Sequence, residues 1–438
     1  MFHRLIIPLL TLAALAPLTL RAENWPQWRG PFHNGSTTET GLPTQWSKTE
    51  NVAWVVPLPG KGSATPVVWG DSVFVTSPDA EKNLLLFCID ATNGKMRWQQ
   101  RVVPGGDFQK GKNNACSPSV VTDGKLAIAT FATGDIAAFD FAGRKVWSRA
   151  LAQEFGKLAY MWIYGSSPLL YRGKLYVQVL QRDPPTYQHS LDDKPNRESF
   201  LLCLDPQTGK TLWRHVRKSD AVGESQESYA TPLPYEGARG TEIILFGGDH
   251  VTGHRADTGA EIWRCGSFNT GKANVWRVIT SPATSPGFIY LGLPKRHPFL
   301  AIKAGAIGHV TPDAQTAWKL DDLMPDVCTP LTYRGKLFVL DGDKQLLACL
   351  DPKTGEKKWQ GSIGKKETFS ASPTGADGKI YCIGERGTIV VLSAGDEFKI
   401  LASFTTDEIP VLSSIVAANG RLFVRTAQNL YCIGGTKK

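Results

Sequence analysis

The residues best suited to chemistry are aromatic and polar side chains in segments that vary between the copies of a repeated unit. Eight of them are candidates for binding a ligand: Trp162, Tyr164, Glu227, Tyr229, Trp276, Arg277, Asn114 and Asp249. Indole and phenol rings beside carboxylate, guanidinium and amide groups suit a polar, ring-shaped ligand such as a sugar or a quinone. The alternative is that these aromatic rings simply fill a tapering channel.

The chain lacks the motifs that mark most enzymes and metal sites. It contains no G-x-S-x-G nucleophile motif, no phosphate-binding loop, no zinc-type cysteine pair and no C-x-x-C-H haem attachment motif. His250 and His254 are four residues apart, but that spacing brings two imidazoles to one metal ion only on a helix. On strands or a hairpin the two rings diverge. We therefore predict no catalytic residue and no metal site.

The elements that must position the candidates belong to a unit repeated eight times. Its first anchor is a small residue close to a proline, followed by a short apolar strand, a turn with glycine and a second strand of aromatic and β-branched residues. The copies begin near residues 63, 115, 165, 229, 279, 327, 370 and, in degenerate form, 412. Such self-similarity indicates a repeat architecture.

A second anchor follows each first one: a tight turn ending in glycine, with a tryptophan four residues later. Asp205–Trp213 and Asp351–Trp359 are the clearest copies. The glycine supplies the positive φ that such a turn requires. The tryptophans at this position are Trp54, Trp98, Trp147, Trp213, Trp263, Trp318 and Trp359, and Leu401 takes the place in a further copy.

Units of four strands, here A to D, predict a radial arrangement of blades. The eighth unit ends after its third strand, near Cys432, whereas residues 51–58 form a spare strand before the first unit. A ring that joins these two ends needs no capping unit. We therefore predict an all-β fold, an eight-bladed β-propeller of four-stranded antiparallel blades, closed by an N-terminal strand that completes the last blade.

The variable segments should meet on one face of this ring. In an A-B-C-D meander the connectors between blades and the B–C hairpins share one face, and the C–D turns share the other. The C–D turns are short and repetitive, whereas segments 112–115, 160–165, 224–229 and 274–278 differ and precede innermost strands. We expect them to surround the mouth of the central channel.

The eight cysteines are predicted to be buried and unpaired. Cys88, Cys203, Cys349 and Cys432 fall at one position of the third strand, and Cys116 and Cys328 are expected to share a position of the first strand. Equivalent positions in different blades lie far beyond the roughly 7 Å Cα separation that a disulfide allows.

The D-x-x-T-G-x-x-x-W element resembles the repeat of the pyrroloquinoline-quinone (PQQ)-like propeller family, over nearly all of the chain after residue 22. The resemblance implies that the seven tryptophans dock one blade on the next. That family includes PQQ-dependent alcohol dehydrogenases, the propeller lipoprotein of the outer-membrane β-barrel assembly machinery, and exported proteins of unassigned role. The opening Asn24–Pro31 (NWPQWRGP) is similar to the start of the last group.

The resemblance leaves three functions open. The leading hypothesis is an exported, non-catalytic binding or scaffolding propeller that recognises a protein or carbohydrate partner. The alternative is a quinoprotein oxidoreductase of alcohols or sugars, with PQQ and calcium as its cofactors, but the adjacent cysteines common in those enzymes are missing. The third is an assembly factor, although no cysteine for lipid attachment follows the N-terminal apolar run.

The N-terminus predicts export. Residues 1–22 combine a short basic start, an apolar run broken by two prolines, and Ala22 as a cleavage residue, which is typical of a signal peptide. Residues 23–50 are then an N-terminal extension and residues 51–438 the propeller, in the periplasm or outside the cell. The net charge of +9 is scattered, so we expect no nucleic-acid partner, and no later stretch is long enough to span a membrane. We expect a soluble monomer.

Overall fold

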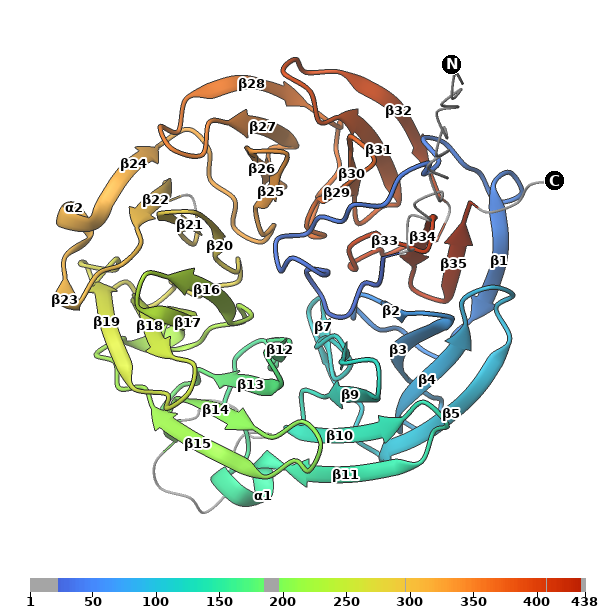
Figure 1. The fold of residues 1–438 in the computed structure, drawn as a ribbon, viewed down its shortest axis with the longest axis horizontal. Helices are drawn as coiled ribbons and strands as arrows, with labels where there is room; N and C mark the ends of the chain where they lie inside the picture. The colour runs from blue at the N-terminus through green and yellow to red at the C-terminus, as the bar shows by residue number, and fades with distance from the viewer. Residues whose placement is uncertain (1–22, 185–196, 296, 407, 435–438) are drawn as a thin grey trace, which may run out of the picture.

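The computed structural model describes residues 23–184, 197–295, 297–406 and 408–434. The predicted signal peptide, residues 1–22, lies outside them. Eight antiparallel sheets surround a central axis (Figure 1), which confirms the predicted eight-bladed propeller. Seven sheets have four strands, and one gains a fifth. No helix within the described ranges is both long enough and apolar enough to cross a bilayer.

Within each blade the strands follow chain order from the channel outwards, except that blade 8 takes its outermost strand from the N-terminus. The strands of blades 1 to 4 are β2 (Val67–Trp69), β3 (Ser72–Pro78), β4 (Leu84–Asp90) and β5 (Met96–Val103); β8 (Val121–Thr122), β9 (Leu126–Thr130), β10 (Asp135–Asp140) and β11 (Lys145–Ala150); β12 (Leu169–Tyr171), β13 (Lys174–Val179), β14 (Phe200–Leu204) and β15 (Thr211–Val216); and β16 (Leu233–Gly237), β17 (Gly240–Gly247), β18 (His250–Arg255) and β19 (Glu261–Gly266). Those of blades 5 to 8 are β20 (Ala283–Ser285), β21 (Phe288–Gly292), β22 (Phe299–Lys303) and β24 (Thr316–Leu320); β25 (Leu331–Tyr333), β26 (Lys336–Asp341), β27 (Leu346–Leu350) and β28 (Lys357–Ser362); β29 (Thr374–Ala376), β30 (Lys379–Ile383), β31 (Thr388–Ser393) and β32 (Ile400–Thr405); and β33 (Val416–Ala418), β34 (Arg421–Arg425), β35 (Asn429–Ile433) and β1 (Val52–Pro57).

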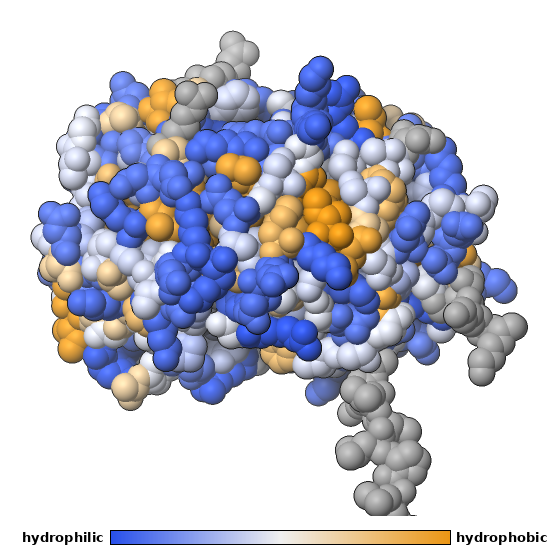
Figure 2. Space-filling view, turned by 90° about the horizontal axis from the view of Figure 1, so that it is seen from above, coloured by the Kyte–Doolittle hydropathy of each residue, from blue (hydrophilic) through white to orange (hydrophobic). Residues whose placement is uncertain are grey.

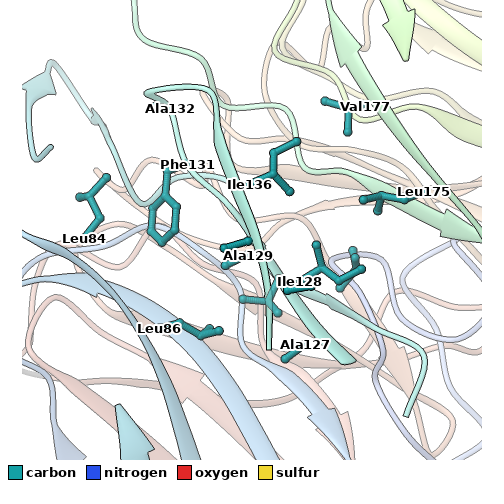
Figure 3. Close-up of a cluster of buried hydrophobic side chains, with 14 of the residues drawn as sticks. Leu84, Leu86, Ala127, Ile128, Ala129, Phe131, Ala132, Ile136, Leu175 and Val177 are labelled. Carbon is teal, nitrogen blue, oxygen red and sulfur yellow. The ribbon is translucent and has the colours of Figure 1, made fainter. Parts of the chain in front are cut away.

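A few elements lie outside this pattern. They are the hairpin β6 (Gln109–Lys110) and β7 (Asn113–Asn114), the helices α1 (Leu151–Phe155) and α2 (Pro312–Gln315), and β23 (Gly308–Val310). Strand β23 pairs in parallel with β19 and so covers the outer edge of blade 4. The core lies between blades: Leu86 of β4, Ala129 of β9 and Val177 of β13 belong to one buried cluster (Figure 3). The flank seen in Figure 2 is mostly hydrophilic with small apolar patches.

The ring closes where the sequence predicted. Strand β1 pairs antiparallel with β35, from Val52 opposite Ile433 to Pro57 opposite Asn429. Blade 8 therefore contains both ends of the propeller chain.

A ring of hydrogen bonds joins the innermost strands around the channel. In each blade a Ser or Thr hydroxyl accepts the backbone N–H of the corresponding residue in the blade before it, at 2.8 to 3.2 Å. The eight residues, in order, are Thr65, Ser119, Ser167, Thr231, Ser281, Thr329, Ser372 and Ser414, and Ser414 donates back to Thr65. The cycle satisfies the N–H that the inner edge of each blade would otherwise leave unpaired.

The ring corrects the predicted alignment of blade 2. Aligning blade 2 on Pro118 predicts that Ser117 supplies the ring hydroxyl, but in the structure Ser119 does. The strand pairing shows why: Val121 pairs with Ile128 in blade 2 as Val67 pairs with Phe74 in blade 1, so Ser119 is the equivalent of Thr65. The repeated feature that the ring of hydrogen bonds requires is a Ser or Thr two residues before the innermost strand. A proline after that residue is not required. Consequently Cys116 and Cys328 do not share a position. All eight cysteines are buried and unpaired.

Outer joints link each blade to the next through tryptophan and glycine. Five indole N–H groups donate to carbonyl oxygens of the C–D turn in the following blade: Trp54 to Ala91, Trp98 to Phe141, Trp147 to Pro206, Trp318 to Pro352 and Trp359 to Gly395. In four of these joints, those of Trp54, Trp98, Trp147 and Trp318, the turn glycine lies against the indole. A Cβ added to Gly209 would lie 2.6 Å from the Trp147 ring.

Two joints differ. Trp263 donates to the Glu242 carboxylate of its own blade (2.7 Å), because blade 5 replaces the tight turn with the segment that carries β23. In blade 7, Ala402 pairs with Val391 as Trp359 pairs with Cys349, so Ala402 and not Leu401 occupies the tryptophan position. The predicted alignment missed this because the C–D turn of blade 7 is one residue longer: Leu392 pairs with Ile400, eight residues on, whereas Leu350 pairs with Lys357, seven residues on.

We predict that Gly209→Ala destabilises the propeller more than Gly173→Ala does. Both glycines have φ +70°, but nothing lies within 4 Å of a Cβ at Gly173. Each substitution carries a left-handed backbone penalty of roughly 1–2 kcal/mol, and Gly209→Ala adds overpacking of roughly 1–3 kcal/mol. Thermal unfolding of both variants checks this, and equal losses of Tm would contradict the proposed joint.

Candidate functional site

A cavity of about 460 Å³ occupies the mouth of the central channel, and we call it the mouth cavity. Its walls carry hydroxyls of the inner ring and of nearby residues, among them Ser117, Ser167 and Thr231. Trp162, Tyr229, Arg277 and Lys112 also line it, all from segments that precede innermost strands. Because these segments end where the A strands begin, they share the face on which the channel opens.

The N-terminal segment closes the opposite end of the channel. The backbone of Trp25 pairs with Val68, and that of Ser36 with Gly375, near the far ends of inner strands. In Figure 1 this segment crosses the centre of the ring. Trp28, between these two contacts, lines the mouth cavity. The cavity is therefore a blind pocket with an aromatic floor.

Arg29 anchors this closure. Its guanidinium donates to the carbonyl oxygens of Pro330 (3.1 Å) and Pro373 (3.2 Å), in blades 6 and 7. Burial lowers the pKa of Arg29 to about 9. A buried cation held by carbonyl dipoles fixes the position of Trp28 next to it.

Glu227 organises one wall of the mouth cavity from behind. Its buried carboxylate accepts hydrogen bonds from the Tyr229 hydroxyl (2.5 Å), the Met161 backbone N–H (2.8 Å) and the Arg182 guanidinium. Burial raises the pKa of Glu227, against the opposing effect of these hydrogen bonds. The carboxylate is committed to protein groups, so Glu227 positions Tyr229 and does not itself line the cavity.

Trp162 is the exposed aromatic of this wall, with 37% of its surface accessible. Its backbone N–H donates to the Tyr229 hydroxyl (3.1 Å), and its indole N–H donates to Glu224 (2.7 Å). Lys295 approaches the other Glu224 oxygen at 3.3 Å. The indole is thus held in one orientation while its surface stays accessible, as a stacking platform requires.

Two ion pairs border the opening. Arg277 lies 3.2 Å from Asp326 on the wall of blade 5. Lys112, in the hairpin β6–β7, lies 2.6 Å from Glu385 of blade 7. The second pair joins a connector of blades 1 and 2 to blade 7, so the hairpin reaches over part of the mouth.

The structure brings together only part of the predicted site. Trp162, Tyr229 and Arg277 line the mouth cavity, with Glu227 behind them. Asn114 also lies behind the wall, where its amide donates to the lining residue Ser63 and accepts from the Cys116 N–H. The other three do not line the cavity: Tyr164 is in the core and donates to Gln178, Trp276 packs on His297, and Asp249 lies 3.5 Å from Lys272.

Two groups of residues that line the mouth cavity were not predicted from the sequence: Trp28 at its floor and the Ser and Thr hydroxyls of its walls. In the sequence, Trp28 falls in the N-terminal extension, which has no predicted role, and the ring hydroxyls serve only as repeat anchors. The tryptophan in NWPQWRGP and the recurrence of Ser or Thr before the inner strand were the available signals.

The mouth cavity does not fit a calcium-bound quinone. Calcium requires six to eight oxygen ligands and usually several carboxylates. Among the described residues that line the cavity there is no Asp or Glu. The carboxylates that contact lining residues, Glu224, Glu227, Glu385 and Asp326, are paired with Lys295, Arg182, Lys112 and Arg277. We derive no redox step here.

A second cluster combines residue types that can bind a metal, at the joint between blades 3 and 4. Atoms of His215 in β15, His254 in β18 and Glu261 in β19 lie within 4.8 Å of one another. His254 contacts the Gly259 carbonyl through Nδ1 (3.1 Å) and the Thr252 hydroxyl through Nε2 (2.9 Å). Arg264 binds both Glu261 oxygens. The ligand atoms of His254 and Glu261 are therefore engaged by other protein groups.

We predict that His254 makes the protein acid-sensitive. Burial lowers its pKa to about 3, against about 6.5 in an unfolded chain. Because the folded state binds fewer protons than the unfolded chain, the contribution of neutral His254 to the free energy of unfolding is complete above pH about 6.5 and is lost as pH falls towards 3. Tm measured between about pH 7.5 and 4.5 should decline less steeply in His254→Gln than in the parent protein. Parallel declines would contradict the assignment.

Comparisons with known proteins agree with this architecture. A family model described as outer membrane protein assembly factor BamB matches residues 36–177, 123–290 and 303–397. No curated protein matches the sequence. Similar solved structures are BamB from Moraxella catarrhalis (15% identity, TM-score 0.60, 87% of this chain and 99% of that chain), a europium-containing methanol dehydrogenase (11%, 0.66, 94% and 98%) and quinohemoprotein alcohol dehydrogenase from Comamonas testosteroni (12%, 0.60, 95% and 81%). At these identities the likeness concerns the fold alone.

Proposed function

Because the chain belongs to the family of PQQ-like β-propellers matched by the BamB model, we propose that it is an exported, non-catalytic binding propeller that holds a carbohydrate in its mouth cavity. The observation that carries the proposal is the combination of a blind cavity of about 460 Å³ with hydroxyl-bearing walls and aromatic side chains. Ligand pockets of small molecules span roughly 300–1,000 Å³.

The chemistry of the lining supports a sugar. Ser and Thr hydroxyls donate and accept hydrogen bonds, which matches the hydroxyls of a saccharide. Trp162 and Tyr229 offer apolar ring surface for the C–H face of a sugar ring. Arg277 and Lys112 are already neutralised by Asp326 and Glu385, so the lining favours a ligand without a high charge.

The wall is organised before a ligand arrives. Glu227 holds Tyr229, and Tyr229 in turn receives the backbone N–H of Trp162. Groups that are already ordered lose little conformational entropy on binding, which is how a small polar site gains affinity. Glu227 is a positioning residue in this account.

We predict that Trp162→Ala weakens saccharide binding at least about tenfold, or about 1.4 kcal/mol. Tyr229→Phe should also weaken binding, because it removes the hydroxyl that joins Glu227 to Trp162. Val275→Ala is the matched control, since Val275 is 55% exposed and does not line the cavity. Tryptophan fluorescence and thermal shift, with mono- and disaccharides as probes, measure the effect.

Two results would contradict the proposal. One is saccharide binding that Trp162→Ala and Tyr229→Phe leave unchanged. The other is no saccharide binding together with a saturable rise of Tm on adding PQQ and Ca²⁺ and dye-coupled alcohol oxidation, which would establish the quinoprotein alternative.

A further inference from the structure

We propose a second ligand site, for a neutral hydroxyl-bearing ring such as a monosaccharide unit, in a cavity at the joint between blades 7 and 8. This seam cavity has a volume of about 400 Å³ and is lined by Trp46, Phe404, Tyr431, Thr405, Thr406 and Thr426, among others. It shares no lining residue with the mouth cavity. The proposal therefore does not depend on the function proposed above.

The seam cavity lies at a joint that lacks both parts of the usual tryptophan contact. In most joints a tryptophan of the outer strand packs on the C–D turn of the next blade, but blade 8 has no such turn, since its outer strand β1 comes from the N-terminus. Ala402 occupies the tryptophan position of blade 7. The cavity is lined instead by β31, β32, β34, β35 and the segment 45–49.

The N-terminal segment fills only part of the space at this joint. Trp46 is buried and meets the ring of Phe404 edge-on, with centroids 4.8 Å apart. It belongs to the same apolar cluster as Ile389 and Val424, which join blades 7 and 8. The seam cavity lies beside this packed indole, bordered by residues 45–49 on one side and by the two blades on the other.

A partly buried carboxylate orders the polar wall of the seam cavity. Glu408 accepts hydrogen bonds from the Thr426 hydroxyl (2.5 Å), the Asn429 amide (2.8 Å) and the Tyr431 hydroxyl. Thr426 and Tyr431 both line the cavity. This repeats the arrangement at the mouth, where Glu227 holds Tyr229 from behind.

The lining specifies the class of ligand. Aromatic rings stand beside several Thr and Ser hydroxyls, the combination that accepts the apolar face and the hydroxyl edge of a sugar. Among the described lining residues, Lys48 is the one charged side chain, and its charge interacts with that of Glu408. The site therefore favours a neutral ligand over an anion or a cation.

The test uses the full chain carrying Trp162→Ala, so that the mouth cavity is impaired. The probes are D-glucose, N-acetyl-D-glucosamine and maltose, followed by saturation-transfer difference NMR. We expect saturable binding of at least one probe. Phe404→Leu, which removes an aromatic wall, and Thr405→Val, which replaces a hydroxyl by a methyl group, should each weaken that binding at least about tenfold.

The matched control is Thr388→Val, because Thr388 pairs with Thr405 across strands β31 and β32 but does not line the cavity. Thr405 is exposed, so Thr405→Val decides the matter even where Phe404→Leu fails to fold. The proposal is overturned by the absence of any saccharide signal in the Trp162→Ala background, or by a signal that neither substitution weakens. Failure of the mouth site would instead appear as saccharide binding that Trp162→Ala does not change and Thr405→Val abolishes.

Discussion

The ring of eight N–H-to-hydroxyl hydrogen bonds around the channel is the constraint on which the rest of the structure depends. Each bond joins one blade to the next, and the last returns to the first. A backbone donor at the inner edge of a blade has no strand to pair with, so each innermost strand must present a hydroxyl to its neighbour. The requirement fixes the spacing of the blades at the axis, while the tryptophan–glycine joints set it at the circumference. Together these contacts leave the mouth face free to vary.

The same ring determines what the mouth cavity can offer. Because small hydroxyl residues line the axis, the channel is wide and polar where bulky residues would have filled it. Among the described lining residues, the aromatic side chains therefore come from the connectors above and from Trp28 below. The connectors are loops, and they are ordered by carboxylates bonded to several donors, namely the buried Glu227 and the partly buried Glu408. The low-dielectric surrounding of Glu227 strengthens its bonds and makes the geometry of that wall well defined.

The N-terminal segment links closure of the ring to both cavities. Its strand β1 completes blade 8, its Trp28 forms the floor of the mouth cavity, and its Trp46 borders the seam cavity. In this ring one blade is made from both ends of the chain, and that blade lacks the C–D turn on which tryptophans pack in other joints. The two irregular features of this propeller, the N-terminal segment across the channel and the seam cavity between blades 7 and 8, are therefore both connected with the way the ring closes.

By itself the sequence determined the number of blades, their four strands, the closing strand and the unpaired cysteines, because each follows from local patterns that repeat eight times. It also pointed to the mouth face, and three of eight candidates, Trp162, Tyr229 and Arg277, line one cavity there. Only the tertiary structure decided that Tyr164 and Trp276 are buried. It also decided that Ser119, not Ser117, is the ring hydroxyl of blade 2 and that Ala402, not Leu401, takes the tryptophan position of blade 7. Finally, it decided that Trp28 and Trp46 line the two cavities. Repetition reports the average blade, whereas a turn or connector of different length shifts the register locally. A segment without a repeat carries no local sign of where it crosses the ring.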